Sequence, residues 1–188
     1  MAAVDSRPLR LTADAVRVLV LFSAVAVALT AHDGAVMLSM LFLVVLVPRV
    51  TLLPAGVDLL VCAVLTWATW SAVGRWYRVA DWYDTLVHSV TPGVVAVALH
   101  LLLARWRLLP APGDRALRRA AVPLITAGVG AVVAVLWELY EGLATQVFEA
   151  RIPVGYTDTL VDLAVGTGGS VLAGIVVAAR ANRRSSTT

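Results

Sequence analysis

The sequence predicts an all-α, polytopic membrane protein of about six transmembrane helices in one bundle, and three observations support this fold class. Of its 188 residues, 60% are hydrophobic and 14% are charged, whereas soluble domains carry about 25% charged residues. The apolar residues form separate runs, and several runs reach the roughly 20 residues that cross a bilayer. The basic residues are all Arg and stand at the ends of these runs, as the positive-inside rule predicts. We therefore expect one integral membrane domain over residues 1–188, with membrane lipid as its partner and no nucleic acid.

The first two apolar runs form an expected antiparallel pair after a polar tail at residues 1–14. They span 15–31 and 35–47 and are joined by the tight turn His32-Asp33-Gly34. Basic residues before the first run also give it the pattern of a cleavable signal peptide. We expect the run to be retained, because its removal would leave an odd number of helices. The second run covers only about 20 Å of a core of about 30 Å, so it either continues to Leu53 or is partly re-entrant.

Four further runs complete the predicted bundle and precede a tail at 181–188. The fourth run contains Pro92, one turn beyond His88, where proline frees a backbone carbonyl and can kink the helix. The sixth run carries small residues at every fourth position, a pattern of close helix packing. These residues are Gly166, Ser170 and Gly174, and the four runs span 52–73, 85–104, 120–147 and 159–179.

The distribution of Arg predicts that both termini are cytoplasmic. In a six-helix topology, 12 of the 15 basic residues fall on the side of the termini, and only Arg75, Arg78 and Arg151 fall on the other. The Arg-rich side is cytoplasmic by the positive-inside rule. Trp and Tyr residues gather at the opposite boundary, which is typical of an interfacial belt. They are Trp67, Trp70, Trp76, Tyr77, Trp82, Tyr83, Trp137, Tyr140 and Tyr156.

Three of the predicted helices each carry a pair of ionisable residues near their outer ends. Within each pair the spacing is three or four residues, which places both side chains on one helix face. Ionisable groups at membrane depth are costly, and they tend to be functional or paired. We therefore expect one polar site near the extracytoplasmic face, and its residues are Asp84 and His88, Glu138 and Glu141, and Asp158 and Asp162.

The charge of this group limits what it can be. Two unit charges about 4 Å apart interact by roughly 4 kcal/mol at an effective dielectric near 20. Five carboxylates must therefore be partly protonated, be paired with Arg, or hold a cation. Oxygen ligands with one imidazole suit a divalent ion such as Mg, Mn, Fe or Zn, although the sequence does not say which. In the metal hypothesis Asp84 orients the imidazole, and the ligands are His88, Glu138, Glu141, Asp158 and Asp162.

Structural roles compete with this hypothesis at several positions. Asp84 and Asp158 precede Thr at predicted helix starts, where Asp is a good N-cap. The whole group could instead form a salt-bridge network with nearby Arg. Asp58 lies near the cytoplasmic end of its helix and is expected in another environment, and His100 is expected to be a hydrogen-bonding residue of the inner face.

The same polar residues resemble those of the YjdF-type family of bacterial inner-membrane proteins. The resemblance covers roughly residues 80–175 and rests on Tyr83-Asp84 with His88, on Glu138 with Glu141, and on Asp158-Thr159 with Asp162. It implies a multi-pass protein of the inner membrane but no established activity. Asp84 and His88 are also remotely similar to an Asp-Lys-x-x-His element of VanZ-like proteins. Thr85 replaces the Lys of that element, so nothing is carried over from them.

Three functions follow as hypotheses. The first is a metal-dependent enzyme that acts on a lipid or polyprenyl substrate, with Asp84, His88, Glu138, Glu141, Asp158 and Asp162 as its catalytic group. The second is a cation- or proton-coupled transporter that uses the same residues as its ion site. The third is a structural or assembly protein with a buried ion-pair network. The sequence specifies neither the substrate nor the oligomeric state.

Overall fold

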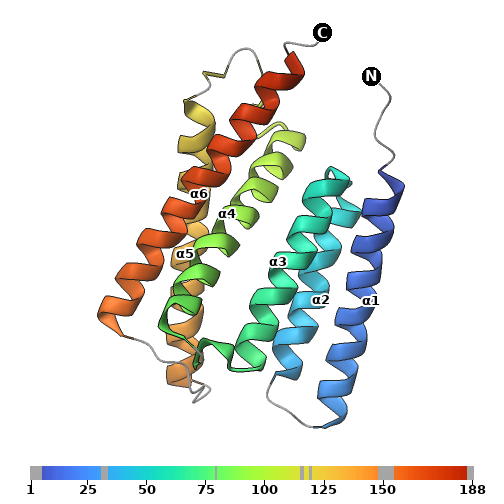
Figure 1. Ribbon diagram of the computed structural model, residues 1–188, viewed down its shortest axis with the longest axis vertical. Coiled ribbons are helices and arrows are strands. Elements are labelled where there is room, and N and C mark those ends of the chain that lie inside the picture. Colours follow the sequence, from blue (N-terminus) through green and yellow to red (C-terminus); the bar gives the residue numbers. More distant parts are fainter. Residues whose placement is uncertain are drawn as a thin grey trace. The chain divides into compact units, whose positions relative to one another are not determined.

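The computed structural model describes residues 6–30, 34–78, 80–114, 117–118, 120–147 and 155–185, and in these ranges it is helical with no strand. Six α-helices follow one another along the chain (Figure 1). A short 3-10 helix, η1 (Trp76–Arg78), lies between the third and the fourth. The α-helices are α1 (Arg7–Leu29), α2 (Ala35–Val50), α3 (Ala55–Val73), α4 (Asp81–Arg105), α5 (Ala121–Val147) and α6 (Tyr156–Ser185).

Five of these helices, α1, α3, α4, α5 and α6, are long and apolar enough to cross a membrane. The other, α2, has 16 residues, which corresponds to about 24 Å of helix. This result confirms the predicted fold class, a polytopic helical membrane protein. It also shows that the second apolar run continues as helix through Pro48 to Val50. The predicted turn before it lies outside the described residues apart from Gly34, which precedes α2.

The start of α1 differs from the sequence prediction. The helix begins at Arg7, eight residues before the apolar run expected at 15–31. Pro8 stands in its first turn, where proline costs no hydrogen bond and its fixed φ suits a helix. The polar turns that follow carry Arg10 and Asp14, which bond to side chains of other helices. Interhelix ion pairs therefore extend the helix into a segment whose hydropathy alone predicts a tail.

Two compact units divide the chain, and the first comprises Met1–Asp81. In it, α1, α2 and α3 pack against one another around an apolar core. The core residues are Ala13, Val20, Ala24, Leu38, Leu41, Val45 and Cys62.

The second unit, Trp82–Thr188, contains α4, α5 and α6. The predicted small-residue face of α6 packs against α5, as expected. Ser170 is fully buried beside Gly130, where a Cβ would collide with the Ser170 hydroxyl. Gly174 likewise faces Pro123 and Thr126 of α5. The close fit explains why α5 and α6 run side by side along much of their length (Figure 1).

The same helix, α6, also meets α4 at the turn that contains Pro92. Because proline has no N–H, the His88 carbonyl lacks its usual helical donor. A Cβ built on Gly166 would lie 3.2 Å from that carbonyl oxygen, and one built on Gly169 would overlap the Ser89 carbonyl. Glycine thus lets α6 approach the bare backbone of α4 directly beside His88.

Further along α4, His100 forms the hydrogen bonds expected of it. The side chain is 1% exposed. Its Nδ1 lies 3.3 Å from the Thr126 hydroxyl, and its Nε2 lies 3.2 Å from the Pro110 carbonyl. His100 therefore links α4 to α5 and to the segment between these helices, 12 residues away from His88.

Candidate metal centre

His88 is the centre of the candidate site, two turns into α4. Its Nε2 lies 3.5 Å from an Asp84 oxygen, one turn earlier on the same helix. Its Nδ1 lies 3.8 Å from Oε1 of Glu138 on α5 and 3.8 Å from Oδ1 of Asp162 on α6. Three helices therefore bring one imidazole and three carboxylates to a single point.

The side chains of this group differ in how deeply they are buried. The side chains of His88, Glu138 and Asp162 are only 9%, 10% and 4% exposed, whereas that of Asp84 is 31% exposed. Oε1 of Glu138 is buried and has no hydrogen-bond partner in the part of the chain that the structure describes. A buried polar atom without a partner is rare in proteins and is costly. This oxygen therefore makes Glu138 a candidate binding residue.

The distances fit a metal site only in part, because the three possible ligand residues span a greater distance than one ion bridges. Ligand atoms of Asp84, His88 and Asp162 lie within 4.8 Å of one another. Two ligands that each lie about 2.1 Å from one ion are at most about 4.2 Å apart. The two contacts of 3.8 Å made by His88 Nδ1 fall below this limit. Nδ1 of His88 thus faces the two buried carboxylates, and Nε2 faces Asp84.

The two remaining predicted residues lie outside this cluster. Asp158, one turn before Asp162 on α6, is exposed, and Glu141, one turn beyond Glu138 on α5, is partly buried. Neither forms an ion pair in the part of the chain that the structure describes. Both remain close enough to add negative charge to the site without contacting His88.

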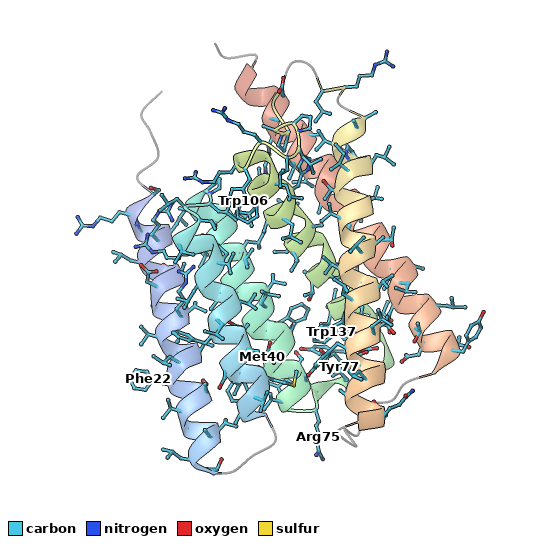
Figure 2. All side chains as sticks on the ribbon, turned by 180° about the vertical axis from the view of Figure 1, so that it is seen from behind. Phe22, Met40, Arg75, Tyr77, Trp106 and Trp137 are labelled. Carbon is cyan, nitrogen blue, oxygen red and sulfur yellow. The ribbon has the colours of Figure 1, made fainter. Side chains whose placement is uncertain are left out.

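Aromatic side chains surround this end of α5. Figure 2 shows Trp137 on the part of α5 that carries Glu138. The ring centroids of Trp137 and Tyr140 are 5.4 Å apart, and those of Trp82 and Tyr83 at the start of α4 are 6.0 Å apart. Tyr156 at the start of α6 is 83% exposed. Aromatic rings of this kind favour the membrane–water interface.

A comparison with known families identifies the family of the chain. The model of a family described as "Predicted membrane protein (DUF2238)" matches residues 9–183. This is the YjdF-type family. The chain belongs to it. No curated protein and no solved structure matches the chain. All six predicted site residues of this YjdF-type protein lie inside the matched range.

Sequence reasoning missed a second ionic cluster, which lies in the first unit of the YjdF-type protein. Asp58 on α3 is fully buried and forms an ion pair with Arg17 of α1, which is 4% exposed. Arg10 lies 3.5 Å from the other Asp58 oxygen. The signal was present, because Arg17 and Asp58 are opposite charges inside two apolar runs. Asp58 does lie in an environment separate from the site of His88, as expected, and that environment is an ionic cluster with Arg17 and Arg10.

Proposed function

We propose that this membrane protein binds a divalent metal ion through Nδ1 of His88 and the carboxylates of Glu138 and Asp162. We further propose that the ion serves an enzyme of the bacterial inner membrane that acts on a lipid or polyprenyl substrate. One observation carries the proposal: the buried Oε1 of Glu138 has no hydrogen-bond partner among the described residues, and it lies 3.8 Å from Nδ1 of His88.

Charge supports a cation in preference to a purely structural network. Within the described ranges, His88 is the sole basic side chain that pairs with Asp84, Glu138 or Asp162. One imidazolium cannot compensate three ionised carboxylates, and isolated buried charges are strongly disfavoured. A divalent ion compensates two of the charges and gives the Glu138 oxygen a partner.

The donor set narrows the class of ion. One imidazole nitrogen with carboxylate oxygens suits Zn, Mn or Fe and, with more bound water, Mg. In this scheme the Nε2–H of His88, which lies 3.5 Å from an Asp84 oxygen, would donate to that carboxylate, and this would fix the tautomer that leaves the Nδ1 lone pair free for an ion. Asp84 is accordingly a positioning residue in this scheme.

The location of the site suggests the class of substrate. A bound divalent ion would supply an activated water and would polarise a carbonyl or phosphoryl oxygen. All four residues of the group lie in helices apolar enough to span a membrane, so an amphiphile with a polar head can reach them from the lipid phase. Asp84, the most exposed member, marks the open side of the site. Hydrolysis or transfer of a lipid head group fits these features.

Metal analysis tests the first step of the proposal. The full chain is purified in detergent, supplied in turn with Mg, Mn, Fe and Zn, and analysed for bound metal. We expect near-stoichiometric metal in the wild type and its loss in Glu138→Gln and Asp162→Asn. Asp158→Asn is the matched control on α6 and should keep the metal. The proposal is overturned if the wild type binds none of the four ions. It is also overturned if a folded variant that carries both Glu138→Gln and Asp162→Asn still binds one of them.

A second candidate function is proton- or cation-coupled transport, and the lone Glu138 oxygen also favours it. A carboxyl group that alternates between protonated and ionised states needs such a protected position in an apolar span. Flux measured in proteoliposomes distinguishes the two functions. Flux that Glu138→Gln abolishes would favour transport, whereas metal binding without any flux would favour the enzyme.

A further inference from the structure

The first unit carries an Arg side chain whose bonding capacity is only partly used. Nε of Arg49, near the end of α2, lies 3.1 Å from an Asp14 oxygen. The side chain is 41% exposed. Its two terminal nitrogens have no partner among the described residues. A guanidinium group can donate five hydrogen bonds, so most of its donors face outward.

The surrounding ionic cluster leaves this positive charge in excess. Three Arg residues and two Asp residues bond together at this end of α1, α2 and α3. Both Asp58 oxygens are bound by Arg17 and Arg10, and the Asp14 oxygen that Arg49 contacts is shared with Arg17. Among these five described residues the positive charges exceed the negative charges by one, and Arg49 is the most exposed of the three Arg side chains.

An apolar groove lies on the seam between α1 and α2, about two helical turns from Arg49. It has a volume of about 290 Å³ and is lined almost wholly by apolar atoms. Phe42 precedes Arg49 by seven residues on α2, and Leu21 and Ala28 follow Asp14 by seven and 14 residues on α1. Residues seven apart lie on one helix face. These groove residues therefore lie on the same face of α2 as Arg49 and on the same face of α1 as Asp14. The lining residues are Leu21, Ala24, Val25, Ala28, Ser39, Phe42 and Leu43.

The dimensions suit an elongated amphiphile. Seven residues of helix correspond to about 10 Å, so the groove begins about that far from the charged end of the seam. The face of α1 beside the groove is strongly apolar, and Figure 2 shows Phe22 pointing outward from it. Phe22 is 68% exposed, and Val25 is 50% exposed. A ligand of this seam therefore carries negative charge at one end and hydrocarbon at the other.

We propose that this seam is a binding site for a diacyl phospholipid. The phosphate of the lipid accepts hydrogen bonds from the terminal nitrogens of Arg49, and an acyl chain lies in the groove between α1 and α2. The planar fork of Arg matches phosphate oxygens in a bidentate arrangement. This site uses none of the residues of the candidate metal centre and does not depend on it.

Native mass spectrometry of the full chain, released from detergent with phosphatidylglycerol added, tests this site. We expect Arg49→Gln to weaken binding about tenfold or more, as expected for loss of hydrogen bonds from a charged donor. Arg49→Lys keeps the charge without the fork and should bind at an intermediate level. Arg180→Gln, at an exposed Arg of α6, is the matched control and should bind as the wild type does.

Two further probes separate the head group from the chain. Diacylglycerol with the same acyl chains lacks the phosphate and should bind at least tenfold more weakly than phosphatidylglycerol. Ala28→Phe fills the groove at an exposed position and should weaken phosphatidylglycerol binding. Glycerol phosphate, which has no chains, should not compete. Wild-type binding by Arg49→Gln or Ala28→Phe, or equal binding of diacylglycerol, overturns the proposal, and thermal unfolding of each variant verifies its fold.

Discussion

The protein contains two buried ionic clusters of opposite design, one in each compact unit. In the first unit, Asp58 is fully buried, and both of its oxygens are bound by Arg side chains. In the second unit, Glu138 and Asp162 are almost as deeply buried, and the basic group that each contacts among the described residues is a shared imidazole nitrogen at 3.8 Å. Within the described residues, the chain thus neutralises the buried charge of the first cluster more completely than that of the second.

This difference separates a structural role from a functional one. Arg17 donates to Asp14 of its own helix, to the Val45 carbonyl of α2 and to Asp58 of α3, so two of its three acceptors join α1 to other helices. Such a cluster needs no ligand. Around His88 the ratio is reversed, with three carboxylates and one imidazole, and Oε1 of Glu138 has no hydrogen-bond partner among the described residues. A cation or protons bound there would supply the missing compensation, which is the basis of the proposed ion site.

The largest effect should come from breaking the neutralised cluster. Asp58→Asn leaves Arg17 buried without its main counter-charge, and loss of one partner of a buried pair costs about 3–5 kcal/mol. We expect a large fall in the unfolding temperature in detergent, while the metal content of the folded fraction stays unchanged. The double variant Arg17→Met with Asp58→Leu removes both charges and should recover much of the loss. A stable Asp58→Asn variant would contradict the structural role.

The stability of the cluster around His88 should instead depend on a bound ion. An ion at 100 times its dissociation constant stabilises the folded state by about 2.7 kcal/mol. We expect the bound metal to raise the unfolding temperature of the wild type and EDTA to reverse the change. Glu138→Gln should show no rise with metal. In EDTA it should be at least as stable as the wild type, because a buried carboxylate has been removed. Destabilisation of Glu138→Gln in EDTA would instead indicate a structural ion-pair network.

The spacing of residues in the sequence was enough to identify the neighbourhood of this site. Pairs three or four residues apart lie on one helix face, and alternating helix directions bring the start of α4, the end of α5 and the start of α6 to one end of their unit. Spacing does not determine which member of each pair points inward. That depends on the rotation of each helix about its axis, which packing sets. Glu138 and Asp162 are turned towards His88, while Asp158 is turned outward.

The cluster of the first unit was harder to predict because its partners are far apart in the sequence. Asp58 and Arg17 are separated by 41 residues, and no periodicity connects them. Hydropathy also placed the start of α1 too late, since Arg10 and Asp14 look like tail residues until their partners on other helices are known. Apolar runs therefore predicted the number of helices well and predicted polar helix ends poorly.

A smaller effect should come from the glycine contact that supports His88. Gly169→Ala drives a methyl group into the Ser89 carbonyl of α4, and such overpacking costs about 1–3 kcal/mol. We expect lower stability together with weaker metal binding, because α4 and α6 carry different members of the site. Gly168→Ala is a matched control, since a Cβ there meets nothing within 4 Å. It should be neutral or stabilise by up to about 1 kcal/mol. Equal metal affinity in both variants would show that this contact does not position the site.

The smallest effect is expected at Asp158, and it sharpens the distinction between charges near the site and charges in it. The residue is exposed at the start of α6, where substitutions usually change stability by no more than about 0.5 kcal/mol. Asp158→Asn should therefore leave the unfolding temperature nearly unchanged and reduce metal affinity only slightly, through loss of a nearby negative charge.

Asp84→Asn is the informative comparison. It removes the acceptor that holds Nε2 of His88, so it should weaken metal binding about 10- to 100-fold, as loss of a partner that orients a ligand does. If isothermal titration instead shows equal losses for both variants, Asp84 acts on the ion only through its charge, and the tautomer of His88 is set by some other group.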